Sequence, residues 1–474
     1  MSEAILPTPA ITQEDQQTKE WTPAKVIYVF LMAFNLLSYF ALLANHTGIN
    51  MPAYIWIPRI ATAPLAIYLG KLWKDRGFRI LTVYFLLFFL RASVASNVFA
   101  TEASESILSA LWLFAGCYGL ARILTVKQLT KFLLSGSIIW TAGMAVLCCL
   151  GIYVAWTEQP IQLLNGDIHL YYDPNNQGAA RLELAYFATI SGSMMSIAIL
   201  TGMISALCVK NRFCKTVLFL MLIPIMIALA LTDSRTAYIS VSAGLAIMAF
   251  AGVLNYYQTK TKDITNKSKN WKPWIIGILI MAIIFVLLVL AILQITPAFN
   301  HVRAQGIIPR ALAEETVKTE VAARGFSGDR VLTGRSELWS MIFNYLKDHK
   351  TVFLTGESKQ LPLLNIAVWF GHSHCLYLQV LVESGIPGLL LVLSFIIYII
   401  INAVRAITNP ELPLWIRLLP AIIASLLVAD LVECFLWLRA SYAPMTTVFF
   451  IVAGILNTLV PKKPKKKSLP EPTV

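Results

Sequence analysis

Long apolar runs recur along the chain, and they constrain its fold more than any other feature of the sequence. Hydrophobic residues make up 57% of the 474 residues and charged residues only 13%, whereas soluble domains carry roughly 25% charged residues. A helix needs about 20 predominantly apolar residues to cross the hydrocarbon core of a bilayer. Because the runs are continuous rather than alternating, they exclude a β-barrel. The sequence therefore predicts an all-α integral membrane protein.

Twelve of these runs predict transmembrane helices, at residues 26–45, 53–70, 80–99, 106–121, 132–155, 183–208, 216–231, 236–256, 273–295, 386–404, 415–437 and 440–460. The loops between them are short except at about 156–182 and 296–385. We therefore divide the chain into an N-terminal tail (1–25), helices one to nine (26–295), one large loop with short helices (296–385), helices ten to twelve (386–460) and a basic tail (461–474).

Lysine and arginine gather in alternate loops, which explains the net charge of +13 without a nucleic-acid partner. Loops rich in Lys and Arg are cytoplasmic by the positive-inside rule. An even number of spans then places both termini in the cytoplasm and both long loops on the outer side of the membrane. The basic tail is also expected to contact anionic membrane lipids.

Two histidines, His372 and His374, close the large loop just before the tenth predicted helix. A neutral imidazole at a membrane surface can take a proton from a hydroxyl group, so this segment is a candidate general base. The alternative is a pair of interfacial histidines that cap the helix. Cys375 could also form a disulfide with Cys434.

Arginines outside the cytoplasmic loops are candidates for binding an anionic substrate, because charges within spans are expensive and are often functional. Arg59, Arg91 and Arg439 belong to this group. The alternative for Arg59 and Arg91 is contact with lipid phosphates.

The turn Thr232–Thr236 carries Arg235 beside Asp233, in a very tight outer connection between two helices. A guanidinium offers a planar fork that matches phosphate oxygens. A local ion pair between Arg235 and Asp233 is the alternative interpretation.

Arg335 opens a helical pattern in the large loop, with Ser336 as a candidate N-cap. A helix N-terminus and a guanidinium together favour an anion, although a solvated loop charge is the alternative. Asp430 and Glu433, in the eleventh predicted helix, could pair with these arginines or shape an acceptor pocket. The sequence contains no phosphate-binding loop, His-Glu-x-x-His site or Asp-x-Asp motif, so no nucleotide cofactor and no metal are expected.

Three of these features, in this order, resemble the O-antigen ligase and polymerase superfamily: the Ser234–Arg235 turn, the helix from Arg335 to Trp339 and the His374 segment. His374 is followed at the family's spacing by Gly385 and Gly388. Cys375 departs from the Asn, Ser or Gln that the family has after its histidine. The twelve-helix layout is also similar to that of the family.

The resemblance implies a membrane glycosyltransferase of the GT-C type, a multi-pass protein of a bacterial inner membrane with both termini in the cytoplasm and a periplasmic active site. An O-antigen ligase moves a glycan from undecaprenyl diphosphate to the lipid A–core oligosaccharide. His374 would be the base, and Arg235 and Arg335 would stabilise the leaving diphosphate, with inversion at the anomeric carbon and without metal.

The same residues are also compatible with other functions. An O-antigen polymerase would use the same donor with a lipid-linked repeat unit as acceptor, and a protein O-glycosyltransferase is a third enzyme of this kind. A transporter of lipid-linked glycans would need the arginines but no base.

Overall fold

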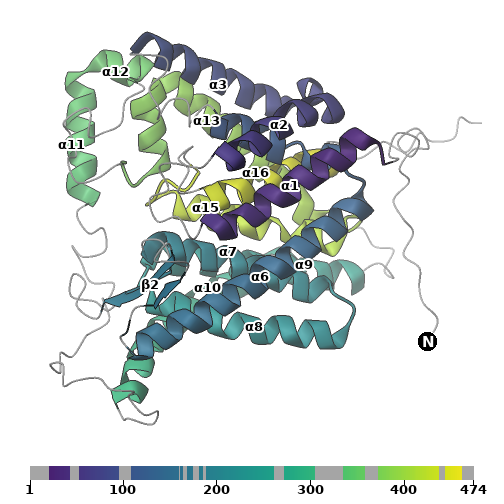
Figure 1. The fold of residues 1–474 in the computed structure, drawn as a ribbon, viewed down its shortest axis with the longest axis vertical. Helices are drawn as coiled ribbons and strands as arrows, with labels where there is room; N and C mark the ends of the chain where they lie inside the picture. Colours follow the sequence, from purple (N-terminus) through teal and green to yellow (C-terminus); the bar gives the residue numbers. More distant parts are fainter. Residues whose placement is uncertain are drawn as a thin grey trace, which may run out of the picture.

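The computed structural model describes residues 21–42, 53–95, 108–157, 159, 161–163, 168–173, 181–184, 188–260, 272–304, 335–357, 372–436 and 443–461. These residues form a bundle of long helices with a small sheet at its edge (Figure 1). The prediction of a helical membrane protein is confirmed in its broad form.

The helices are α1 (Pro23–Leu42), α2 (Ala53–Gly70), η2 (Leu72–Lys74), α3 (Arg76–Ala95), η3 (Trp112–Cys117), α5 (Leu120–Ile123), α6 (Val126–Thr157), α7 (Ala188–Cys208), α8 (Arg212–Leu231), α9 (Arg235–Lys260), α10 (Lys272–Ala304), α11 (Arg335–Asp348), α12 (Lys350–Thr355), α13 (Leu376–Thr408), α14 (Leu414–Leu418), α15 (Pro420–Ala429) and α16 (Ala443–Leu459). Each of the twelve predicted segments contains helix. Within the described residues, six helices are long and apolar enough to cross a membrane: α6, α7, α8, α9, α10 and α13. The total of twelve spans and their sidedness stay predictions.

A three-stranded antiparallel sheet, which the sequence analysis did not predict, lies in the predicted loop 156–182. Its last strand extends to Leu184, so the helix predicted at 183–208 begins only at Ala188. The strands of the sheet are β1 (Ile161–Leu163), β2 (Ile168–Asp173) and β3 (Arg181–Leu184), in the order β1-β2-β3. A Cβ atom on Gly151 of α6 would lie 2.5 Å from Cδ2 of Leu184. The sheet therefore rests directly on α6, and the apolar side chains of β3 are buried there.

Two short helices, α11 and α12, lie in the predicted large loop, against the N-terminal part of α13 (Figure 1). One face of α11 carries Leu338, Ile342 and Leu346, which are buried among residues of α12 and α13. This spacing of four residues places the three side chains on one face, as in an amphipathic helix. The helices on either side extend into the predicted loop, because α10 continues to Ala304 and α13 begins at Leu376.

Gly385 immediately precedes the predicted tenth span (386–404), and the structure shows a break in α13 at this residue. Its φ is 63° and its ψ is −169°, which is a non-helical conformation that favours glycine. A Cβ atom there would lie 2.6 Å from the backbone nitrogen of Gly356 and from the carbonyl oxygen of Leu354. The break therefore lets the end of α12 approach α13 closely, and Glu357 donates a backbone hydrogen bond of 2.9 Å to Val382.

A buried polar cluster around Asp75 connects helices at the other end of α13. The Asp75 carboxylate accepts hydrogen bonds from Arg122 at 3.0 Å and from the Tyr118 hydroxyl at 2.8 Å. The Asn457 amide donates to both Asp75 oxygens, at 2.8 and 2.7 Å. Asn402 of α13 donates to Asn457 at 3.3 Å. The cluster thus links α3, α13 and α16, far from the segment that carries the histidines.

Candidate active site

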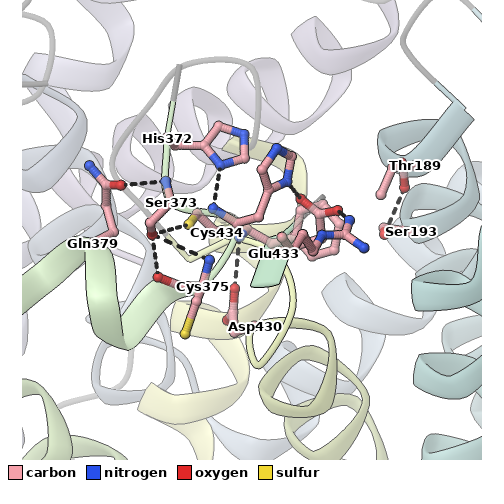
Figure 2. A network of polar contacts seen from close by, with 12 residues as sticks. Thr189, Ser193, His372, Ser373, Cys375, Gln379, Asp430, Glu433 and Cys434 are labelled. Atoms are coloured by element: carbon pink, nitrogen blue, oxygen red, sulfur yellow. Dashed lines mark hydrogen bonds and ion pairs between the residues drawn. The ribbon is translucent and has the colours of Figure 1, made fainter. Parts of the chain in front are cut away.

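The segment from His372 to Cys375 precedes α13 and is held on both sides (Figure 2). The backbone nitrogen of Ser373 donates to Oε1 of Gln379 at 2.9 Å, and the Ser373 hydroxyl donates to the Cys375 carbonyl at 2.7 Å. The indole of Trp339 in α11 donates to the Ser373 carbonyl at 2.8 Å. These bonds fix the backbone that presents the two imidazoles.

His374 stands at the centre of the network. Its φ of 50° lies in the left-handed region, which few residues other than glycine adopt and which is frequent at functional sites. Nδ1 of His374 lies 3.0 Å from Oε2 of Glu433. The backbone nitrogen of His374 donates to Nδ1 of His372 at 3.2 Å, and the two rings have centroids 4.3 Å apart. His372 therefore supports the segment directly.

Glu433 belongs to the turn that follows α15, and this turn is anchored to the start of α13. The backbone nitrogen of Leu376 donates to the carbonyls of Asp430 and Glu433, at 3.1 Å each. Oδ1 of Asp430 accepts from the backbone nitrogens of Phe435 and Leu436, at 2.7 and 3.2 Å. The turn is thereby fixed beneath the histidine segment, as Figure 2 shows.

Arg335, the first residue of α11, forms an ion pair with Glu433. The two carboxylate oxygens have different partners. Oε1 accepts a hydrogen bond from the guanidinium, and Oε2 contacts the imidazole of His374. The side chains of Glu433, Arg335 and His374 are 4%, 15% and 21% exposed. A single buried carboxylate therefore joins the predicted base to one of the predicted phosphate-binding arginines.

The surroundings keep Glu433 ionised. The guanidinium of Arg335 pairs with Oε1 of this carboxylate, and the imidazole of His374 contacts Oε2. An ionised carboxylate only accepts hydrogen bonds. Nδ1 of His374 is therefore the donor in this contact, and in a neutral imidazole of this tautomer the lone pair lies on Nε2.

His372, His374 and Glu433 are also the described residues that could hold a metal ion, with ligand atoms within 4.8 Å of one another. Both Glu433 oxygens, however, already accept from Arg335 and His374. The guanidinium would also repel a cation. The arrangement therefore suits proton transfer better than metal binding.

Arg235 and Asp233 occupy a separate turn, at the start of α9. Asp233 is buried and has a φ of 48°. A Cβ atom on Gly192 of α7 would lie 3.1 Å from Cβ of Ser234, so the turn packs tightly on α7. On α7, one residue beyond Gly192, the Ser193 hydroxyl donates to the Thr189 carbonyl at 2.9 Å (Figure 2).

The remaining predicted residues differ in how far the structure describes them. Arg59 is 1% exposed and its guanidinium carbon lies 5.8 Å from the centre of the Trp112 ring. It faces the interior of the bundle, which argues against contact with lipid phosphates. Arg91 lies in α3, but its side chain is outside the described residues, as is the whole of Arg439.

Cys375 and Cys434 are free thiols, so the disulfide considered from the sequence is absent. Cys434 instead lies 3.7 Å from the Ser373 hydroxyl. The expectation that an acid of the eleventh helix pairs with an arginine is confirmed for Glu433. The contact between Glu433 and His374 was not predicted. The sequence signal that could have indicated it was an acidic residue at the end of an apolar run, where an unpaired charge is costly.

Residues 216–393 match the family described as O-antigen ligase. The matched segment runs from α8 into α13 and includes Arg235, Arg335 and His374, whereas Glu433 lies beyond its end. No curated protein matches the chain. Residues 216–393 are thus similar to the O-antigen ligase family, which supports the resemblance to the O-antigen ligase and polymerase superfamily.

Proposed function

We propose that the protein is an O-antigen ligase, which transfers a glycan from undecaprenyl diphosphate to the lipid A–core oligosaccharide during lipopolysaccharide assembly. The observation that carries the proposal is the joining of His374 and Arg335 through Glu433. A glycosyl transfer from a lipid diphosphate needs both a base for the acceptor and a cation for the leaving group. This site offers the two side by side.

The transfer is a direct displacement. Nε2 of His374 takes the proton of the acceptor hydroxyl while its oxygen bonds to the anomeric carbon. The bond from that carbon to the phosphate oxygen breaks, and undecaprenyl diphosphate leaves with the electron pair. Attack opposite the leaving group inverts the anomeric centre, and general-base catalysis of this kind contributes about 10²–10⁴ in rate.

The diphosphate gains negative charge as it leaves, and cations preorganised near it stabilise that charge. Arg335 donates to Glu433 through one terminal nitrogen. The Nε atom of Arg335 is buried and has no hydrogen-bond partner among the described residues. This N–H group could therefore donate to a phosphate oxygen. Arg235 supplies a second guanidinium from the α9 turn, with Asp233, Arg59, Arg91, Arg439 and His372 as candidates for further substrate contacts. The reaction needs no metal and no nucleotide.

Membrane placement follows from the charge distribution of the loops. Twelve spans with both termini in the cytoplasm would place α11, α12 and the histidine segment in the periplasm of a bacterial inner membrane. The lipid-linked donor would then enter from the outer leaflet, and the polymerised glycan and the core oligosaccharide meet on the same side.

The surface polysaccharide of a deletion strain tests the ligase assignment against its alternatives. Loss of a ligase leaves complete polymer on the carrier lipid and bare core at the cell surface. Loss of a polymerase leaves core carrying a single repeat unit, and loss of a transporter traps repeat units inside. Complementation with His374→Ala separates an enzyme from a transporter, because only the enzyme needs the imidazole.

A further inference from the structure

We infer that Glu433 is a positioning residue for the transfer reaction: its carboxylate fixes the tautomer and orientation of His374 and ties the imidazole to Arg335. The inference rests on the proposed transferase function and adds a residue outside the family-matched segment. Glu433 has no place in the histidine–glycine pattern, and it comes from a different part of the chain.

The geometry gives Glu433 two distinct tasks. With Nδ1 of His374 at 3.0 Å from Oε2, the ring can rotate only by losing this contact. The turn that presents Glu433 is itself bonded to Leu376, two residues after His374. Both ends of the His374–Glu433 contact are therefore held by the same short stretch of backbone.

The charge of Glu433 also matters during proton transfer. When Nε2 takes the acceptor proton, the imidazole becomes a cation, and a buried carboxylate at Nδ1 stabilises that cation far better than water-exposed groups would. A neutral amide in the same place keeps an acceptor but loses the charge, and it can turn to donate to Nδ1 and so select the wrong tautomer.

A purely structural role would be different. If Glu433 served only to anchor α11 through Arg335, the imidazole would be free of it, and removing the carboxylate would weaken the binding of donor or the stability of the fold. The contact with His374 predicts a loss in turnover instead.

The test combines Glu433→Gln with His374→Ala in a double-mutant cycle on the full-length purified protein, with lipid-linked glycan as donor and lipid A–core as acceptor. Glu337→Gln is the matched control, because Glu337 is an exposed acid in the first turn of α11. We expect Glu433→Gln to lower kcat by about 10²-fold or more while the KM for donor changes little. Glu433→Asp keeps the charge with a shorter reach and should be intermediate.

The cycle gives the decisive comparison. If Glu433 acts through His374, the double variant has the same residual turnover as His374→Ala alone, because residues that act as a unit are non-additive. Multiplied losses, or a wild-type kcat in Glu433→Gln, would overturn the inference. A fully active His374→Ala would instead overturn the proposed function. If Glu433→Gln does not accumulate, Glu433→Asp replaces it in the same cycle. A wild-type kcat in Glu433→Asp would then overturn the inference.

Discussion

Replacing Arg335 should show how much of the transfer rate depends on the guanidinium beside the base. Arg335→Ala removes the cation that pairs with Glu433 and the Nε donor that has no partner among the described residues. A charge-assisted hydrogen bond to the diphosphate is worth about 1.5–3 kcal/mol. The bared carboxylate would in addition repel the diphosphate, and unit charges at close range in a site of this kind interact by up to about 4 kcal/mol.

Taken together, these losses amount to about 3 kcal/mol of transition-state stabilisation, which corresponds to about a hundredfold in kcat/KM. Glu433 keeps its contact with His374 in this variant, and Trp339 still holds α11 to Ser373. The protein should therefore accumulate normally, which size-exclusion chromatography in detergent can check before activity is compared.

Arg335→Lys separates charge from shape. A lysine ammonium keeps the charge but lacks the planar fork that can contact Glu433 and a phosphate oxygen at once. We expect kcat/KM to lie between those of wild type and Arg335→Ala, measured by gel-resolved transfer of labelled donor to core. Near-wild-type activity of Arg335→Lys would refute the reasoning, and the same outcome for Arg235→Lys would refute forked phosphate binding at the α9 turn.

The remaining predictions concern the base, the metal, the fold and the membrane. His374→Ala should lower turnover by about 10²-fold or more with donor binding retained, and His372→Ala should be milder; the opposite order would transfer the role of base to His372. EDTA should leave the activity of the purified enzyme unchanged, and recovery by added metal after a loss would contradict an arginine-based mechanism. Asp75→Ala removes the acceptor of a buried ion pair, which costs about 3–5 kcal/mol, so the detergent-solubilised protein should melt at a lower temperature. A reporter fused near Ser327 should be periplasmic and one near Lys267 cytoplasmic, and the reverse pattern would overturn the proposed sidedness.

The helical framework could be predicted because apolar runs of span length leave few alternatives. Each predicted segment contains helix, and the predicted tenth span begins immediately after the break in α13 at Gly385. The helical pattern of α11 could also be recognised in the sequence, and the structure buries Leu338, Ile342 and Leu346 on one face of this helix. The sheet was not predicted, because β1 and β3 are too short for alternation to be recognised.

The site was predicted in part. Charge type identified His374 and Arg335 as separate candidates, but their connection depends on Glu433, and a contact across such a separation leaves no periodic signal in one sequence. The same holds for Arg59, whose burial against Trp112 follows from the packing of α2 on η3. The chemical character of each candidate residue could be predicted from the sequence, whereas the contacts between distant residues required the structure.

The separation of His374 and Glu433 by 59 positions has a consequence for the making of the protein. Synthesis produces the histidine first, and α13, α14 and α15 must all follow before the turn at Glu433 can fold back onto Leu376. A chain that stops at residue 393, where the family match ends, would contain both arginines and the imidazole but not the carboxylate between them. If Glu433 positions His374 as proposed, a working unit of this protein extends beyond α15, although the matched segment ends before it.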